Sequence, residues 1–234
     1  MLPPRCFANS KHLRTVILNT SIGGWYPKGA ARLQASLRDV GYTGNIQCWI
    51  NELPPNCRPH SVIPYHFKPM AFRWAVEHGY DIAIWMDSAV YAIRDIQPLI
   101  DIIESEGHLL FRNGWTSGEW CCDDCLEPLG ITREQSFTYP HIMACVMGFD
   151  LNNTTSLESL SKWLEVAPKA FQGPWNNNDK TCSQDERVLG SRHDQTAMSI
   201  ISTDLNMKWT DVNGIIEYGT TATSDTTMLL SQGL

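Results

Sequence analysis

The first half of the chain alternates between short apolar runs and segments with helical spacing. The apolar runs predict strands at Thr15–Thr20, Asn45–Asn51, Ile82–Met86 and His108–Phe111. Between them, apolar residues three and four positions apart predict helices at 28–40, at 66–78, and between Asp95, as the cap, and Gly107. Strands that alternate with helices build a parallel sheet through right-handed crossovers. We therefore expect an α/β fold with a central, mostly parallel sheet flanked by helices.

The second half is less regular. Residues 142–150 predict a further strand, and helical spacing returns at 156–166 and 193–205. The stretch 168–192 is rich in Asn, Asp, Pro and Gly, which predicts a long loop, and loops of that length are usually functional or mobile. No clear linker divides the chain, so we expect a single domain over residues 1–234.

Composition and charge narrow the class of protein. Hydrophobic residues make up 43% and charged residues 18% of the chain, which is typical of a packed globular protein. The net charge of -7 disfavours nucleic acid as a partner, because phosphates repel a negative surface. The sequence has no apolar stretch long enough for a transmembrane segment, and residues 1–5 lack an apolar signal core. We expect a soluble, cytoplasmic protein whose eight cysteines are mostly reduced.

Asp87 and Ser88 directly follow the apolar strand that ends at Met86. Ligands of open α/β sheets bind beyond the carboxyl ends of the strands, so the Asp87 carboxylate is expected to face a crevice. There it can ligate a metal ion on a diphosphate or accept hydrogen bonds from sugar hydroxyls. A strand-end aspartate that caps the following turn is the alternative.

Three segments resemble the donor-binding half of GT-A glycosyltransferases. They are Tyr65-x-x-Lys68-Pro69, then Gly79-Tyr80-Asp81-x-Ala83-x-Trp85-Met86-Asp87-Ser88, then Asp95-Ile96-x-Pro98-Leu99. The resemblance covers roughly residues 15–111 and implies a GT-A-like sandwich, with a nucleotide-sugar-binding half at 1–112 and an acceptor and catalytic half at 113–234. It also implies a glycosyltransferase that moves a hexose or pentose from a nucleoside diphosphate sugar, such as a UDP- or GDP-sugar, to a hydroxyl of a glycan or related acceptor.

The same resemblance suggests which residues hold the donor. Asn19 and Ser21 would meet the nucleoside, and Ser88 would also bind the donor. Lys68 would approach the diphosphate or only extend its charge from a helix end. Asp87 would bind Mn²⁺ or Mg²⁺, but the third position of the Asp-x-Asp-like motif is Ala89, and no histidine follows His193. A single protein carboxylate holds such a cation weakly, so dependence on a divalent metal stays an open alternative.

The segment Arg192-His193-Asp194-Gln195-Thr196 is similar to the late Asp-Gln motif of these enzymes. The resemblance makes Asp194 the general base of an inverting reaction, or the group that orients the sugar in a retaining one, with His193 and Gln195 beside the donor. The alternative is an ordinary helix start. The proposal as a whole requires that Asp87 and Asp194 meet in one crevice.

The stretch after residue 113 offers acceptor candidates. Trp115 and Trp120 can stack on sugar rings, Glu119 is a second candidate acid or base, and Asp123 and Asp124 can line the acceptor side. Cys122 and Cys125 have the spacing of a zinc knuckle, but a structural zinc site usually needs a second pair, and the sequence has none.

Two rivals remain open. One is a catalytically silent carbohydrate-binding protein on the same fold, which Ala89 favours. The other is a nucleotidyltransferase, but the loop after the first strand carries only Gly23, Gly24 and Lys28 where that class has a Gly-rich basic loop. Phosphate-loop, dinucleotide-binding and serine-hydrolase motifs do not occur in the sequence.

Overall fold

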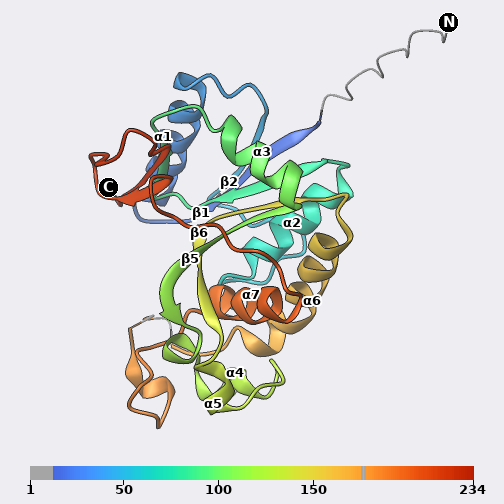
Figure 1. The fold of residues 1–234 in the computed structure, drawn as a ribbon, viewed down its shortest axis with the longest axis vertical. Helices are drawn as coiled ribbons and strands as arrows, with labels where there is room; N and C mark the ends of the chain where they lie inside the picture. Colours follow the sequence, from blue (N-terminus) through green and yellow to red (C-terminus); the bar gives the residue numbers. More distant parts are fainter. Residues whose placement is uncertain (1–12, 175, 177) are drawn as a thin grey trace, which may run out of the picture.

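A five-stranded sheet with the order β2-β1-β3-β6-β5 forms the centre of the molecule (Figure 1). The structure is a computed structural model that describes residues 13–174, 176 and 178–234, so the N-terminal segment 1–5 lies outside it. The strands are β1 (Thr15–Ser21), β2 (Asn45–Ile50), β3 (Ile82–Met86), β5 (His108–Thr116) and β6 (Pro140–Asp150). β1 pairs in parallel with β2 and β3, as the sequence predicts.

The fourth predicted strand, β5, does not lie beside a parallel neighbour as expected. β6 lies between β3 and β5 and runs antiparallel to both. Four of the five strands therefore share one direction, but the expected run of parallel neighbours is interrupted. β5 also continues beyond Phe111 to Thr116, because Arg112 and Thr116 keep pairing with β6 across register shifts.

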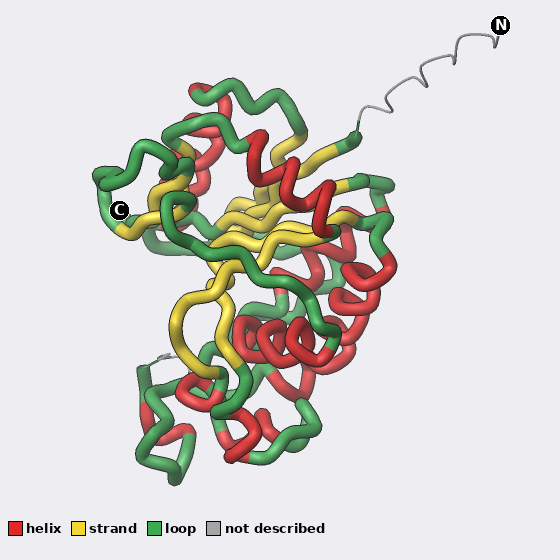
Figure 2. The backbone as a smooth tube through the Cα atoms, viewed as in Figure 1, coloured by secondary structure: helices red, strands yellow, loops and turns green. Residues whose placement is uncertain are grey.

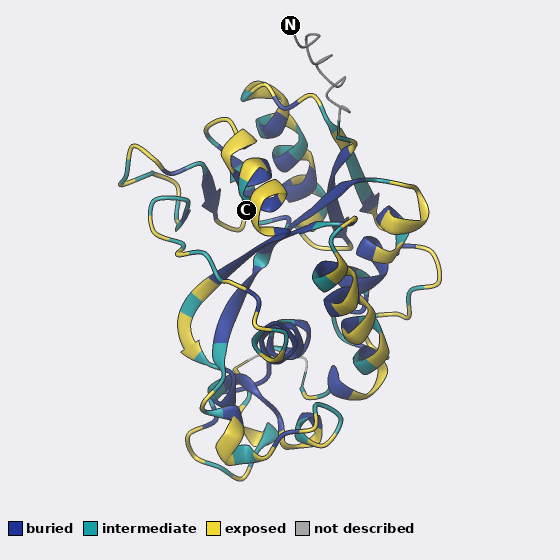
Figure 3. Ribbon diagram, turned by 45° about the vertical axis from the view of Figure 1, so that its right-hand side comes forward, coloured by how far each residue is buried: buried dark blue, intermediate teal, exposed yellow. Residues whose placement is uncertain are grey.

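Helices cover both faces of the sheet (Figure 2), and each face has its own core of buried side chains. α1 (Tyr26–Asp39) and α3 (Gln97–Glu106) pack on one face, with Leu33 and Leu99 in the core. α2 (Phe67–Glu77), α6 (Thr154–Ala170) and α7 (His193–Asp204) pack on the other, around Phe72 and Trp163. α7 is buried almost all round, which is visible in Figure 3. The first turn of α7 therefore delivers its side chains to the interior of the molecule.

Local signals explain several helix ends. Gly107 ends α3 at φ 84°, a left-handed conformation that suits glycine. The cap of this helix is Ile96 rather than the predicted Asp95, whose carboxylate instead accepts a hydrogen bond from the backbone N–H of Gln97 at 2.9 Å. Asn153 caps α6 by accepting from the N–H of Ser156 at 3.1 Å. The predicted loop 168–192 is shorter than expected, because α6 runs on to Ala170 with Pro168 inside it.

A small second sheet was not predicted. It has the order β4-β8-β7, with β4 (Val90–Ala92), β7 (Ile216–Tyr218) and β8 (Leu229–Ser231). Each strand has three residues, too few for a clear alternation of polar and apolar positions. Because β4 follows Asp87 closely, this sheet fixes the C-terminal segment beside the end of β3.

β5 and β6 extend past the sheet into a lower part of the molecule (Figure 1). This part contains η1 (Gly118–Trp120), α4 (Asp123–Leu126), α5 (Arg133–Ser136) and η2 (Lys180–Cys182). Backbone N–H groups of Leu189 and Arg192 donate to the carbonyls of Glu119 and Trp120, at 2.7 and 3.1 Å. The segment before α7 is thus tied to η1. Among the described helices, none has the length and apolar character that a membrane crossing requires.

Candidate active site

A cavity of about 580 Å³ lies where the end of β3 meets the start of α7. Its walls come from the segment before α2, from β5 and β6, and from the C-terminal strands. Asp87 and Asp194, far apart in sequence, both line it. The arrangement that the sequence analysis required, two carboxylates in one crevice, is therefore present.

Lys68 joins the two carboxylates. Its Nζ lies 3.0 Å from Asp194 Oδ2 and 3.4 Å from Asp87 Oδ1, and it donates a hydrogen bond to the carbonyl of Ala144 at 2.9 Å. The side chains of Lys68 and Asp194 are each only 4% exposed, whereas that of Asp87 is 36% exposed toward the cavity. One ammonium thus holds both acids in position.

The electrostatics of this trio follow from burial. Desolvation raises the pKa of Asp87 and of Asp194, and Lys68 opposes that effect at both. Burial alone would lower the pKa of Lys68, but the two neighbouring carboxylates outweigh it and the pKa is raised. Lys68 therefore stays charged, while burial favours the protonated form of each carboxyl group and the ammonium favours the ionised form.

Neighbouring groups fix the orientation of Asp87. Trp85 Nε1 donates to Asp87 Oδ1 at 2.6 Å, and the backbone N–H of Asp87 donates to the carbonyl of Cys145 at 2.8 Å. The Lys68 ammonium also lies 5.6 Å from the ring centre of Trp85, within the range of a cation–π contact. The carboxylate is consequently held by the strand that precedes it as well as by the lysine.

Strained backbone occurs at two residues near the start of α7 whose rings pack together. Tyr65 has φ 57° and His193 has φ 34°, values that are uncommon outside glycine and cost free energy. Their rings face each other at 5.5 Å. Such strain is often found at binding sites, where the surrounding structure maintains it.

A polar network lines the β6 side of the cavity. Gln195 Nε2 and Asn113 Nδ2 both donate to the carbonyl of Ile142, at 2.6 and 2.9 Å. Asn113 Nδ2 also lies 3.0 Å from His141 Nδ1. Burial, together with the charge of Arg192, lowers the pKa of His141 to about 3, so the imidazole is neutral at physiological pH.

Four of the predicted donor-binding residues lie behind the cavity rather than among its lining residues. Asn19 is fully buried and donates to the carbonyl of Met86 at 2.7 Å and to Ser88 Oγ at 3.3 Å. Ser21 and Ser88 are also buried, as is His193, whose ring packs on Tyr65. In this structure Asn19 supports the loop that carries Asp87, so a direct contact with the nucleoside stays a prediction.

The two tryptophans predicted on the acceptor side both line the cavity. Trp115 is 46% exposed, whereas Trp120 is largely buried, and their rings meet edge to face at 5.7 Å. The guanidinium of Arg192 lies over the ring of Trp120 at 4.3 Å. The exposed face of Trp115 is therefore the one that is free to meet a ligand.

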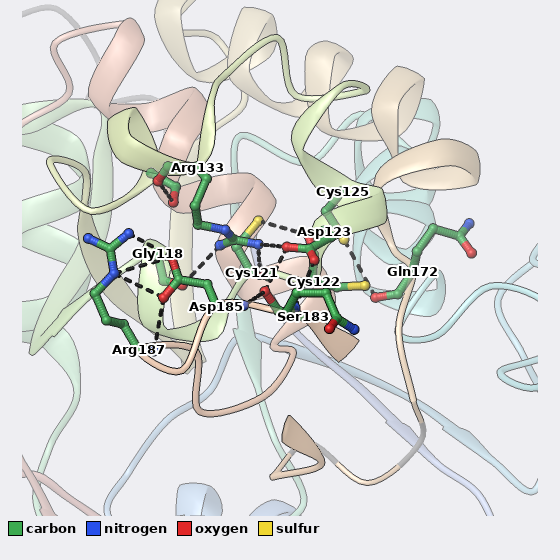
Figure 4. A network of polar contacts seen from close by, with 12 residues as sticks. Gly118, Cys121, Cys122, Asp123, Cys125, Arg133, Gln172, Ser183, Asp185 and Arg187 are labelled. Carbon is green, nitrogen blue, oxygen red and sulfur yellow. Dashed lines mark hydrogen bonds and ion pairs between the residues drawn. The ribbon is translucent and has the colours of Figure 1, made fainter. Parts of the chain in front are cut away.

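The predicted acidic acceptor residues lie in the lower part, outside the cavity lining. Glu119 accepts hydrogen bonds from the backbone N–H and the hydroxyl of Thr116, at 2.7 and 2.9 Å. Asp123 is paired with Arg133 and accepts from Ser183 Oγ at 2.7 Å, as Figure 4 shows. Asp124 is exposed on α4. Glu119 and Asp123 stabilise a turn and a loop here, and the roles of all three carboxylates toward an acceptor stay predictions.

The cysteines near α4 form a small buried cluster (Figure 4). Hydrogen bonding to Cys121 raises the pKa of Cys125 to about 12, and hydrogen bonding to Cys125 raises that of Cys122. These thiols are therefore protonated. Within the described residues, no group of three or more His, Cys, Asp or Glu side chains is arranged to hold a metal ion.

The donor set at Asp87 does not fit a protein-held Mn²⁺ or Mg²⁺. Ala89 lines the cavity where the family motif has a second carboxylate, and its own carbonyl accepts a hydrogen bond from Arg32 Nη2 at 2.9 Å. Asp87 and Asp194 already share Lys68. Hard divalent cations need several oxygen ligands, and the described residues supply too few of them here.

Several residues that line the cavity had no function predicted from the sequence. Arg192 was part of the late motif, but the pattern did not indicate the direction of its side chain. Cys145 lies on β6, a strand that was predicted without a reason to face a ligand, and Tyr218 lies on the unpredicted β7. The signal available for Arg192 was its place one residue before a helix that carries Asp194.

Comparisons with known proteins give the fold. No family model matches the chain, and no curated protein sequence matches it. Among solved structures, the WbbM bifunctional glycosyltransferase superposes with a TM-score of 0.51 at 12% identity, covering 93% of this chain and 41% of that one. This chain thus spans less than half the length of WbbM. The likeness shows a GT-A-like fold and confirms the predicted fold class.

Two further structures superpose with lower TM-scores. A glycosyltransferase involved in glycosylation of the major capsid of PBCV-1 has a TM-score of 0.48 at 15% identity, covering 84% of this chain and 81% of its own. Mouse xyloside xylosyltransferase 1 has a TM-score of 0.47 at 10% identity, covering 89% of this chain and 88% of its own.

Proposed function

We propose that this protein is a glycosyltransferase that moves a sugar from a nucleoside diphosphate sugar to a hydroxyl group of a glycan or related acceptor. The observation that carries the proposal is the meeting of Asp87, Lys68 and Asp194 in one cavity at the carboxyl end of β3. Open α/β sheets bind their ligands at this place. The sugar is a hexose or pentose, and the nucleotide is a uridine or guanosine diphosphate.

The proposed reaction breaks the bond between the anomeric carbon and the diphosphate oxygen, and the nucleoside diphosphate leaves with the electron pair. The acceptor oxygen forms the new bond at the anomeric carbon and loses its proton. Asp194 is the group assigned to that proton in an inverting reaction, and to orienting the sugar in a retaining one. Burial raises its pKa, which makes it a better base than an exposed aspartate.

Asp87 serves the donor in this proposal. Its carboxylate keeps about a third of its surface open to the cavity (36%) while Trp85 and Lys68 fix its direction. A carboxylate held in this way accepts hydrogen bonds from ribose or sugar hydroxyls with little loss of entropy on binding. Trp115, across the cavity, offers its exposed face to the acceptor sugar.

Hydrolysis of nucleotide sugars tests the proposal, because slow transfer to water needs no known acceptor. A panel of UDP- and GDP-sugars is incubated with the protein, and release of the nucleoside diphosphate is measured. We expect at least one donor to be hydrolysed, and Asp87→Asn and Asp194→Asn to lower that rate by about 10²-fold or more. Asp101→Asn, an exposed change on α3, is the matched control. Folded aspartate variants with unchanged rates would contradict both assignments.

A catalytically silent carbohydrate-binding protein is the second candidate. Ala89 favours it, because the site lacks the carboxylate that the family motif places there. Calorimetric titration separates the two functions. A silent binder takes free glycan without nucleotide and ignores UDP and GDP, whereas a transferase binds one of these nucleotides.

A further inference from the structure

The charges that line the cavity are few. In the part of the chain that the structure describes, the charged lining residues are Lys68, Asp87, Arg192 and Asp194. A donor diphosphate brings several negative charges, and it must be received by a cation or by N–H groups. The metal-ligand set does not fit a divalent ion, so the question is which side chain supplies the positive charge.

Lys68 is not available for this purpose. A lysine ammonium has three N–H donors, and three oxygen atoms already lie around Nζ. They are the Ala144 carbonyl at 2.9 Å, Asp194 Oδ2 at 3.0 Å and Asp87 Oδ1 at 3.4 Å. Turning toward a phosphate would leave buried carboxylates uncompensated, which is costly. Lys68 is therefore a positioning residue for the two acids.

Arg192 is better placed than Lys68 to receive the diphosphate. It precedes α7, a helix of 12 residues whose N-terminus favours anions. A guanidinium has five N–H donors, and among the described residues one group of Arg192, Nη2, donates a side-chain hydrogen bond to Asn178 Oδ1 at 3.2 Å. The ring of Trp120 supports its face at 4.3 Å. Stacking on one face leaves the donor edge of the guanidinium able to meet a planar or tetrahedral oxyanion.

The surroundings of Arg192 place its charge over the same space as the acids. Its charge interacts with Tyr65, Asp194 and Tyr218, which all line the cavity. Arg192 is half-buried, so its attraction for an anion is screened by water less than that of a surface arginine. Asp194, two residues along the chain, faces Lys68 rather than Arg192. Among the described residues, the guanidinium therefore interacts with the charge of Asp194 without forming an ion pair with it.

We propose that Arg192 binds the diphosphate of the donor through its guanidinium and stabilises it as the leaving group, so that donor binding needs no divalent metal. This inference rests on the proposed function and names the group that carries out one part of it. Two parallel hydrogen bonds from a guanidinium to phosphate oxygens provide both charge and direction. Lys68 keeps the two carboxylates in place, and Arg192 receives the anion.

Calorimetric titration with UDP and GDP tests the inference, in a chelator and again in Mn²⁺. We expect the better of the two nucleotides to bind in the chelator with an affinity within about twofold of that in Mn²⁺, and Arg192→Gln to weaken binding by about tenfold or more. Uridine or guanosine, which lack the diphosphate, should bind both proteins equally. Arg192→Lys keeps the positive charge but lacks the two parallel N–H donors. Its affinity for the nucleotide should therefore lie between those of wild type and Arg192→Gln. Arg73→Gln, an exposed change on α2, is the control.

The outcomes separate the two proposals. Binding of UDP or GDP only in the presence of Mn²⁺, with Arg192→Gln unchanged, would overturn the role of Arg192 and leave the transferase function standing. Absence of nucleotide binding and of donor hydrolysis in all conditions would overturn the proposed function itself. If Arg192→Gln does not fold, Arg192→Lys decides, since a wild-type affinity for both nucleotide and nucleoside would reject the bidentate contact.

Discussion

Lys68 Nζ lies 3.0 Å from Asp194 Oδ2, and both side chains are almost completely removed from water. The pair joins α2 to α7 across the interior of the molecule. Asp87, whose side chain is 36% exposed, lies 3.4 Å from the same ammonium, so one cation serves two carboxyl groups. Buried ion pairs are weak evidence for stability, since desolvation offsets their attraction. Their place in a cavity is better explained by binding or catalysis.

Lys68→Met removes the ammonium that is paired with the buried Asp194 and with the partly exposed Asp87. We expect the free energy of unfolding to fall by about 3–5 kcal/mol at neutral pH, the usual effect of breaking a buried pair. Urea denaturation followed by circular dichroism measures it. Lys162→Met is the matched control, because Lys162 pairs with Glu158 on an exposed helix face and should change stability by less than about 1 kcal/mol. Equal losses in the two variants would contradict the assignment.

The pH dependence of stability offers a second test. Burial raises the pKa of Asp194 above its ordinary value of 3.8, so the folded protein keeps that proton to higher pH than the unfolded chain does. The free energy of unfolding therefore falls as pH rises from about 3.8 through the raised pKa. Asp194→Asn lacks this proton, and its stability relative to wild type should increase over the same window.

The measurement is a series of urea midpoints for both proteins between acid and neutral pH. Asp101→Asn, at an exposed position, should show a constant difference from wild type across the series. A stability of Asp194→Asn relative to wild type that falls as pH rises would mean that Lys68 dominates and holds the pKa of Asp194 down.

Much of the fold could be predicted because its signals are local. The strand Ile82–Met86 is wholly apolar, and Gly107 marks the end of α3, so element type followed from the sequence. The insertion of β6 between β3 and β5 could not be predicted, since strand order depends on contacts between distant segments. The three-residue strands of the second sheet were too short for any periodic signal.

The site was predictable in part. Asp87 and Asp194 were found from a strand end and a helix start, and both line the cavity. The burial of Asn19 could not be seen, because a polar residue at a strand end reads the same whether it faces a ligand or supports a loop. The bonding of Lys68 to both acids was equally hidden, since it depends on how α2 and α7 pack.

Trp115→Ala tests the assignment of an acceptor side. Trp115 lines the cavity with 46% of its surface exposed, and the proposed function assigns it to the acceptor and Asp87 to the donor. We expect donor hydrolysis to stay within about twofold of wild type, while KM for a glycan acceptor found by panel screening rises roughly five- to tenfold. Tyr26→Ala removes an aromatic ring of similar exposure outside the cavity lining and serves as control. A parallel loss of donor hydrolysis would place Trp115 at the donor instead.

Gly29→Ala tests how closely α1 packs against the loop that follows Asp87. A Cβ at Gly29 would lie 2.3 Å from the carbonyl oxygen of Ser88 and 2.8 Å from the ring of Trp25, closer than atoms can approach. Either α1 or the loop must shift, and overpacking of this kind costs about 1–3 kcal/mol. The better helix propensity of alanine offsets roughly 1 kcal/mol of that loss.

We therefore expect a modestly lower urea midpoint for Gly29→Ala together with weaker UDP or GDP binding, because displacement of Ser88 moves the neighbouring Asp87. Lys28→Ala, an exposed change in the first turn of the same helix, should affect neither quantity. A lower midpoint with unchanged nucleotide affinity would show that α1 moves and the loop does not. Unchanged values of both would mean that the close approach of α1 to Ser88 does not exist in solution.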